Sequence, residues 1–263
     1  VVEFFYMFFG LNRLGAIPVM SIPMHRRMEV NHEIGLHRAK GIIVPVGEKF
    51  DYVEMVEEMK NEHPYLKIFL TIGGKAPSGW IAIEDLVTQE IEKEYPKNYL
   101  EQFKPVPDDI CVEQLSGGTT GLPKGIPRTY NDYICEWDYM GRSRGFTDEI
   151  VALDVIPVAH NGSAAAIWGP LVFRGGTTVL TRCTKPKEQF ELIEKLRITY
   201  VVLMPVLLHY WMESTELRKQ YDLSSLKRIG VGSQKVGPEQ ARWCMEDLGI
   251  TFTTGFGMSE GSL

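Results

Sequence analysis

Short apolar runs alternate along the chain with stretches whose apolar residues have helical spacing. Val53, Val56 and Met59 recur in this way within residues 50–60, and Phe190, Ile193 and Leu196 form a similar stripe further on. The apolar runs predict buried strands at residues 15–22, 41–46, 67–72, 110–115, 151–156, 177–180, 200–204 and 228–231. The apolar opening at residues 1–9 predicts a buried helix. Strands that alternate with helices and are apolar throughout predict an α/β fold, with helices layered on two largely parallel sheets.

Composition narrows the class of protein. The 263 residues are 44% hydrophobic and 24% charged, and the formal net charge of -6 argues against a bulk nucleic-acid binder. No apolar run reaches the 18 residues that a membrane span requires. The four cysteines lie far apart, which argues against a disulfide framework or a zinc site and predicts buried, reduced thiols in a cytoplasmic protein.

The Pro/Asp-rich residues 104–109 are the best candidate for a seam between two lobes. Immediately after them, the predicted strand at 110–115 leads into the most informative segment of the chain. This segment, residues 115–125, combines glycines, hydroxyl groups and one lysine: Ser116, Gly117, Gly118, Thr119, Thr120, Gly121 and Lys124. Glycines allow successive N–H groups to form an anion-binding nest, and the hydroxyls and the ammonium group add further donors. The segment therefore predicts a triphosphate-binding loop.

The loop differs from the Walker A pattern, because Pro123 stands where that pattern needs glycine before the lysine. Instead, S-G-G-T-T-G-L-P-K-G resembles the phosphate loop of the adenylate-forming superfamily, which includes acyl-CoA synthetases, luciferases and adenylation domains. Residues 15–19 and 256–261 resemble further landmarks of that superfamily, with Ser259 in place of the usual threonine. The resemblance covers residues 1–263 and implies the large N-terminal domain of an adenylate-forming enzyme. It also implies that the domain is incomplete, that a mobile C-terminal lid is absent, and that this fragment is poorly active or inactive alone.

The resemblance also implies the cofactors and their contacts. ATP would be held by the phosphate loop and by Gly232, Ser233, Gln234, Phe256, Gly257 and Ser259. Glu260 would hold Mg²⁺, which prefers oxygen ligands and often takes only one or two carboxylates. Lys124, Glu260 and His160 are the expected catalytic residues, and Lys235 is expected beside the acyl pocket.

The acid pocket is expected just after the strand at 151–156, where α/β proteins place residues that face ligands. His160, Asn161 and Gly162 are the candidates. The His-Asn pair is similar to that of 2,3-dihydroxybenzoate–AMP ligases, in which the asparagine hydrogen-bonds a ring hydroxyl of the aryl acid. The chain departs from that subgroup at residues 164–166, where three alanines replace the serine contacts and favour a less polar benzoate.

Several readings stay open from the sequence alone. The activated acid is expected to pass to a thiol, either of CoA or of a carrier protein, and the acid itself could be fatty rather than aromatic. A non-catalytic nucleotide-binding module is a second class of function. Residues 257–261 also match the G-x-S-x-G nucleophile elbow of hydrolases, but no histidine follows Ser259 to complete a triad.

Overall fold

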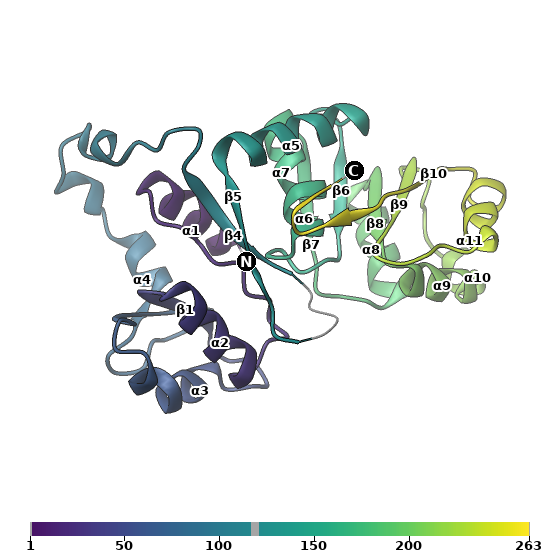
Figure 1. Cartoon of the computed structure of the whole chain (residues 1–263). Coiled ribbons are helices and arrows are strands. Elements are labelled where there is room, and N and C mark those ends of the chain that lie inside the picture. Colours follow the sequence, from purple (N-terminus) through teal and green to yellow (C-terminus); the bar gives the residue numbers. More distant parts are fainter. Residues whose placement is uncertain (1, 117–120, 263) are drawn as a thin grey trace. The chain divides into compact units, whose positions relative to one another are not determined.

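The computed structural model describes residues 2–116 and 121–262. The chain divides into two compact units, residues 1–130 and 131–263 (Figure 1). Both units contain a parallel sheet covered by helices, so the predicted α/β class is confirmed. Residues 104–109 lie inside the first unit, and the seam proposed there stays a prediction.

The first unit is built on three parallel strands in the order β1-β2-β3. The strands are β1 (Gly41–Pro45), β2 (Ile68–Ile72) and β3 (Ile81–Ala82). The helices are α1 (Val2–Arg13), α2 (Arg27–His37), α3 (Tyr52–Met59) and α4 (Ile83–Thr88), with 3-10 turns at 60–62, 91–93 and 99–103. Val56 and Met59 of α3 are fully buried, together with Val30 and Ile34 of α2, in the core against β1. The helical spacing in residues 50–60 therefore predicted the buried face of α3.

A hairpin in the first unit was not predicted. Strand β4 (Ile110–Leu115) pairs antiparallel with β5 (Gly125–Thr129), and Leu115 stands opposite Gly125. The second strand gave no sequence signal, because a glycine, a proline and an arginine interrupt its apolar pattern. The segment that we expected to bind phosphate thus connects two antiparallel strands.

Two sequence predictions for the N-terminal region need correction. Residues 15–22 do not form a strand; only Val19 makes an isolated parallel bridge, to Glu113, since Pro18 lacks the N–H that a continuous ladder requires. The opening segment is the helix that we predicted, but it is not a buried one. Within the described part of α1, only Phe8 and Asn12 are buried, and Tyr6 is 54% exposed.

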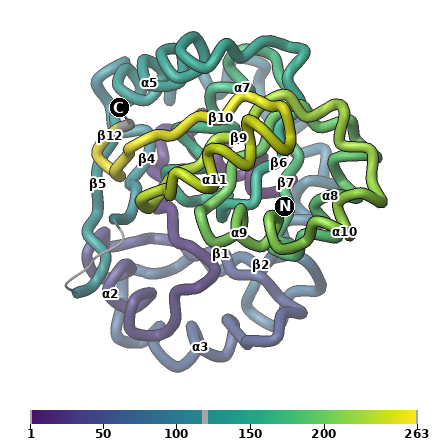
Figure 2. Tube along the Cα trace, turned by 90° about the vertical axis from the view of Figure 1, so that its right-hand side faces the viewer, coloured from purple at the N-terminus to yellow at the C-terminus, as the bar shows by residue number. Residues whose placement is uncertain are grey.

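The second unit is built on five parallel strands in the order β10-β9-β8-β6-β7. They are β6 (Val151–Asp154), β7 (Thr177–Leu180), β8 (Tyr200–Leu203), β9 (Arg228–Val231) and β10 (Thr251–Thr254). The connecting helices are α5 (Tyr130–Ser143), α6 (Asn161–Ser163), α7 (Gly169–Arg174), α8 (Pro186–Leu196), α9 (Pro205–Glu213), α10 (Thr215–Arg218) and α11 (Pro238–Arg242), with π-helical turns at 164–168 and 243–247. Figure 2 shows α5 and α7 on one side of the strands and α8 and α9 on the other.

Alternating residues of β6 and β8 fill the two faces of this sheet. Leu153 and Val201 enter the larger core, which also contains residues of α8 and α9. Ala152 and Tyr200, their neighbours along β6 and β8, enter the smaller core with Leu171 of α7. Because successive side chains of a strand point to opposite faces, a sheet covered on both faces requires the unbroken apolar runs seen in the sequence.

The described helices and cysteines bear on two further expectations. In the described part of the chain, no helix is long and apolar enough to cross a bilayer. The four cysteines are all free, as expected, although Cys135 is exposed and only Cys111 and Cys244 are buried.

Gly169 offers a test of the packing in the second unit. A Cβ at this position would lie 2.2 Å from the Trp137 ring and 2.4 Å from the Ala164 carbonyl oxygen. We expect Gly169→Ala to lower the free energy of unfolding by about 1–3 kcal/mol, the usual cost of overpacking, in urea denaturation followed by tryptophan fluorescence. Gly10→Ala, in an open position of α1 with no neighbour within 4 Å, is the control and should be neutral or stabilising by up to ~1 kcal/mol. Equal effects of the two variants would contradict the crowding at Gly169.

Candidate functional site

The base of the predicted phosphate loop is closed by two hydrogen bonds in the first unit. The Ser116 N–H donates to the Lys124 carbonyl oxygen at 3.0 Å, and the Lys124 N–H donates to Ser116 Oγ at 3.3 Å. The Lys124 side chain is exposed, and among the residues that the structure describes no carboxylate pairs with it. The structure therefore brings Ser116 and Lys124 together at the mouth of the loop. Gly121 is exposed in the same segment, whereas Gly117, Gly118, Thr119 and Thr120 lie outside the described residues.

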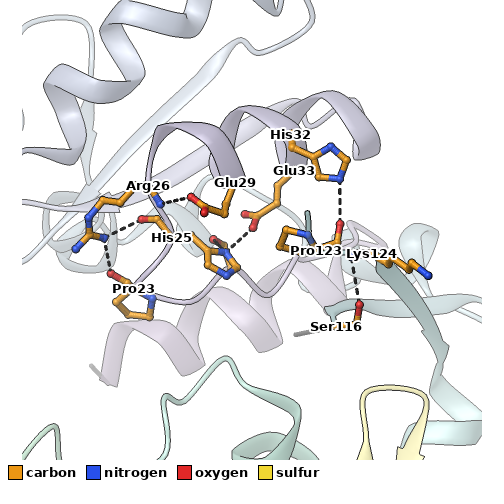
Figure 3. A network of polar contacts seen from close by, with 10 residues as sticks. Pro23, His25, Arg26, Glu29, His32, Glu33, Ser116, Pro123 and Lys124 are labelled. Carbon is orange, nitrogen blue, oxygen red and sulfur yellow. Dashed lines mark hydrogen bonds and ion pairs between the residues drawn. The ribbon is translucent and has the colours of Figure 1, made fainter. Parts of the chain in front are cut away.

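Helix α2 supports this loop from one side (Figure 3). Nε2 of His32 lies 3.0 Å from the Pro123 carbonyl oxygen; since a carbonyl only accepts, this ring nitrogen carries the proton. Gly125 lies directly against His37, and a Cβ there would be only 2.3 Å from Cε1 of that ring. A side chain at position 125 would therefore displace the His37 ring from its place against the hairpin.

The start of α2 is fixed by its own polar contacts. The Arg26 N–H donates to Glu29 Oε2 at 3.0 Å, as in a capping box, and the Arg26 guanidinium donates to the Tyr52 hydroxyl. Nδ1 of His25 lies 2.5 Å from the buried Glu33 carboxylate (Figure 3). These contacts hold the helix that carries His32, so the loop rests on a well-anchored element.

The five-stranded sheet of the second unit has a topological switch point. The chain passes from β6 to β7 in one direction and then crosses back, so that β8, β9 and β10 follow on the other side of β6. In open α/β sheets, ligands bind beyond the carboxyl ends of the strands where the order reverses. Here that place is between β6 and β8. The loop after β6 carries His160 and Asn161, as the sequence predicted.

His160 begins the short helix α6 as its N-cap residue. Its Nδ1 accepts the Gly162 N–H at 2.9 Å, so the neutral ring has its proton on Nε2. The residue is partly accessible to solvent, but the protein around it desolvates the ring and lowers the pKa of His160 below its usual value. A neutral imidazole is therefore the expected form in solution near pH 7.

Asn161 is buried, with 5% of its surface exposed. Its Nδ2 donates to the Met258 carbonyl oxygen at 3.0 Å, which fixes the orientation of the carboxamide. Its Oδ1 is also buried, and no group among the described residues donates a hydrogen bond to it. An unsatisfied acceptor of this kind costs free energy, so it is a candidate contact for a ligand that brings a donor.

The loops after β9 and β10 leave from the same edge of the sheet. Gly232 and Gly255 follow these neighbouring strands, and a Cβ on Gly232 would lie 3.4 Å from the Gly255 carbonyl oxygen. Ser233 has a φ of 73°, a left-handed conformation that is uncommon outside glycine. Gln234 and Lys235 continue this loop with exposed side chains. Three predicted segments of the second unit thus lie at one edge of one sheet.

Residues 256–261 form a small turn joined to the acid-pocket segment. Strands β11 (Gly257–Met258) and β12 (Gly261–Ser262) pair antiparallel, and Asn161 bonds to the first of them through Met258. Phe256 and Glu260 are exposed. The described residues contain no group of three metal-ligating side chains. An exposed single carboxylate fits a Mg²⁺ that arrives with the phosphates of a nucleotide, which need only one or two protein ligands.

Two features of the site escaped the sequence analysis. Asp154, the last residue of β6, is 0% exposed, and it accepts hydrogen bonds from Ser163 Oγ at 2.5 Å and from the Ile156 N–H at 2.9 Å. Burial raises the pKa of Asp154 to about 7, and these two hydrogen bonds limit the rise. Met204 directly follows β8, across the switch point from His160. The apolar runs predicted both strands, but the burial of the Asp154 carboxyl group and the position of Met204 beside the switch point depend on tertiary structure.

Comparison with known proteins identifies the family to which the chain belongs. A family model described as "AMP-binding enzyme" matches residues 1–263. The chain belongs to the AMP-binding enzyme family. It is 34% identical over 262 residues to a 2,3-dihydroxybenzoate-AMP ligase of Bacillus subtilis, with 98% of this chain and 46% of the relative covered. It is 32% identical to a salicyl-AMP ligase / salicyl-S-ArCP synthetase of Mycobacterium tuberculosis, with 99% and 45% covered.

Solved structures of AMP-binding enzymes share the fold. The apo structure of MbtA from Mycobacterium smegmatis matches with a TM-score of 0.82 and 27% identity, covering 99% of this chain and 46% of that one. An anthranilate CoA ligase, AuaEII, in complex with anthranoyl-AMP matches with a TM-score of 0.80 at 21% identity, covering 95% and 47%. The chain spans about half the length of the curated relatives it matches. The fold class and the superfamily resemblance predicted from the sequence are therefore confirmed.

Asp154 gives this site a testable pH dependence. Its folded pKa of about 7 exceeds the usual 3.8, so between these values the folded state binds the proton that the unfolded state has lost. This carboxyl therefore lowers stability as pH rises from about 4 to 7. Asparagine keeps both hydrogen bonds but never ionises. We expect the melting temperature of Asp154→Asn, relative to the unsubstituted protein, to be higher at pH 8 than at pH 5.

Differential scanning calorimetry at both pH values measures this difference. Asp148→Asn, which changes an exposed carboxylate of the same unit, is the matched control and should show no such trend. If the melting temperatures of Asp154→Asn and the unsubstituted protein differ by the same amount at pH 5 and pH 8, the raised pKa of Asp154 is contradicted.

Proposed function

We propose that the protein activates an aryl carboxylic acid as its acyl adenylate, with ATP as the second substrate and pyrophosphate as the product. The observation that carries the aryl assignment is the buried, unsatisfied Oδ1 of Asn161 at the switch point of the sheet. Membership of the AMP-binding enzyme family supports the adenylation chemistry. The relatives whose names specify 2,3-dihydroxybenzoate and salicylate support the class of acid.

The environment of Asn161 fits a hydroxylated aromatic acid. A phenolic hydroxyl ortho to the carboxylate can donate a hydrogen bond to Oδ1, whereas a straight-chain acid leaves this acceptor unsatisfied. Ala164 and Ala165 in the turn that follows are fully buried and offer only methyl groups. One polar contact in apolar surroundings favours a benzoate with one hydroxyl over a more polar one.

The phosphate loop supplies the contacts for the nucleotide. We assign the ATP triphosphate to residues 116–124, whose base is closed by the hydrogen bonds between Ser116 and Lys124. Lys124 provides a compact charge on the rim of the loop, without a competing carboxylate among the described residues. We assign the adenine side of the nucleotide to residues 232–234 and 256–259, and Lys235 to the acid side.

The reaction exchanges one phosphorus–oxygen bond for another. An oxygen of the substrate carboxylate forms a bond to the α-phosphorus, and the bond from that phosphorus to the bridging oxygen of the β-phosphate breaks, so pyrophosphate leaves with the electron pair. Both reactants are anions, so the protein must offset their repulsion and hold the carboxylate oxygen close to the α-phosphorus in the correct orientation. Lys124 would stabilise the departing pyrophosphate. Mg²⁺, when bound, would supply additional positive charge, and we assign its protein ligand to Glu260.

His160 has a positioning role in this proposal. Its lowered pKa keeps the imidazole neutral near pH 7, and its Nδ1 is engaged by the Gly162 N–H. The ring therefore shapes the acid pocket without adding a charge. We assign no proton transfer to it, because the attacking group is already a carboxylate.

The activated acid would pass to a thiol, either of CoA or of a carrier protein. The printed names of relatives include both kinds of acceptor, since one is a salicyl-S-ArCP synthetase and another a salicylyl-CoA synthase. A cytoplasmic location, where ATP and CoA are both present, belongs to the same proposal.

Pyrophosphate–ATP exchange by the full-length protein tests the function. We expect exchange that depends on 2-hydroxybenzoate, weaker exchange with benzoate and the least with straight-chain acids. If only fatty acids support exchange, the aryl assignment is wrong and the substrate is a fatty acid. Nucleotide binding without exchange for any acid would identify a non-catalytic nucleotide-binding module instead.

Asn161→Ala tests the contact that carries the aryl assignment. Loss of one hydrogen bond to a buried acceptor is expected to lower kcat/KM for 2-hydroxybenzoate by about tenfold, with a smaller effect on benzoate, which cannot donate to Oδ1. Asn98→Ala, an exposed residue of the first unit, is the control and should leave both values unchanged. An equal loss for both acids would rule out a hydroxyl contact at Asn161.

Lys124→Ala tests the phosphate loop. Removal of a cation that stabilises the leaving group is expected to lower kcat/KM for ATP by about 10²-fold or more in the exchange assay. Lys75→Ala removes another exposed lysine of the same unit and serves as the control. Activity within twofold of the unsubstituted protein after Lys124→Ala would exclude this lysine from the reaction.

A further inference from the structure

A carboxyl–hydroxyl pair lies beneath the acid-pocket segment. Asp154 at the end of β6 and Ser163 in α6 are both 0% exposed, and Ser163 Oγ donates to Asp154 Oδ2 at 2.5 Å. The second oxygen of Asp154 accepts the Ile156 N–H at 2.9 Å. Both hydrogen-bond partners of the carboxyl group are close to it in the sequence. Among the described residues, no basic side chain forms an ion pair with it.

This pair closes a loop around the proposed acid-binding residues. Residues 155–162 lie between Asp154 and Ser163 in the sequence and include His160 and Asn161. The Ser163 N–H donates to the His160 carbonyl oxygen at 2.9 Å and closes the first turn of a helical run that continues through the π-helical turn at 164–168 into α7. Trp168 Nε1 donates to the Val158 carbonyl oxygen at 2.9 Å and holds the middle of the loop. The segment is therefore anchored at its ends and at its centre.

Anchoring Ser163 also fixes the direction of Asn161. The two residues stand two positions apart in one helical turn, so rotation of the turn about its axis moves both side chains together. The hydrogen bond to Asp154 sets that rotation from the sheet side, and the bond from Asn161 Nδ2 to Met258 sets it from the other side. With both bonds made, Oδ1 of Asn161 remains as the buried acceptor.

A buried carboxyl–hydroxyl pair costs free energy of folding, so stability alone does not explain why it holds this turn. Burying a carboxyl group disfavours its ionised form, and two apolar side chains of similar volume would fill the same space without that cost. A directional bond, however, specifies one rotation of the turn, which apolar packing does less strictly. This difference points to a role in positioning.

We propose that Asp154 and Ser163 are positioning residues that orient Asn161 and so set the preference for hydroxylated over unsubstituted aryl acids. The inference rests on the proposed function, because it assumes an aryl acid whose hydroxyl meets Asn161. It adds two residues that do not touch the acid themselves. Their effect is on discrimination between acids, and the handling of ATP in the first unit's loop is left unchanged.

The test compares kcat/KM for 2-hydroxybenzoate with that for benzoate, in pyrophosphate exchange by the full-length protein. Ser163→Ala is expected to lower this ratio about fivefold to tenfold, as loss of a well-oriented hydrogen bond would, with KM for ATP unchanged. Asp154→Asn keeps an acceptor for the Ile156 N–H and an amide that can donate to Ser163 Oγ, so it should keep the ratio within about twofold. In the Asn161→Ala background, Ser163→Ala should not lower the ratio further.

Ser225→Ala is the matched control. Ser225 is also a buried serine of the second unit, and its Oγ donates to the Ile198 carbonyl oxygen at 2.9 Å, away from residues 154–163. It should cost stability without changing the ratio. If Ser163→Ala does not fold, Ser163→Cys retains the size of the side chain with a weaker donor and should give a smaller fall in the ratio.

Two results would overturn the inference, and only one of them would also overturn the proposed function. Equal losses for both acids in Ser163→Ala, as in Ser225→Ala, would show that the pair serves stability alone while leaving the proposed function intact. Absence of exchange with any aryl acid in the unsubstituted protein would remove the proposed function and this inference together. The unsubstituted protein thus tests the function, and the ratio in the variants tests the positioning.

Discussion

Five parallel strands of the second unit end at one edge of a sheet, and the loops that carry its candidate ligand contacts all leave from that edge. Parallel strands impose this arrangement, since each must be followed by a crossover before the next begins. The strand order reverses between β6 and β8, the place where open α/β sheets bind ligands. The position of His160 and Asn161 beyond β6 follows from this topology, and so does the proposed acid pocket.

The same segment shows how a polar site is held on an apolar sheet. Strand β6 contributes Ala152 and Leu153 to the two cores and then ends in Asp154, a buried carboxyl group with two local donors. Each oxygen of this group accepts one hydrogen bond, whereas one oxygen of Asn161 has no donor among the described residues. This unsatisfied acceptor is the candidate ligand contact on which the proposed function rests.

The proposed phosphate loop of the first unit is held in a different way. It joins two antiparallel strands, its base is closed between Ser116 and Lys124, and α2 supports it through His32. The loop therefore does not begin a helix, as it does in the Walker A arrangement. A hairpin fixes both ends of the loop by backbone pairing, so Lys124 can remain exposed while its backbone is held.

The sequence by itself determined the α/β class, the family and the segments that carry the candidate site, because apolar periodicity and the glycine–threonine motif are local properties of the chain. Strand boundaries such as 110–115 and 177–180 also followed from apolar runs. Tertiary structure decided that β5 pairs with β4, that residues 15–22 make only one bridge, and that Asp154 is buried beside Ser163. Each of these depends on partners distant in the sequence or on the packing around a side chain. The spacing of nearby residues can predict the apolar face of an element, but it encodes neither which strands pair nor whether a polar side chain is buried.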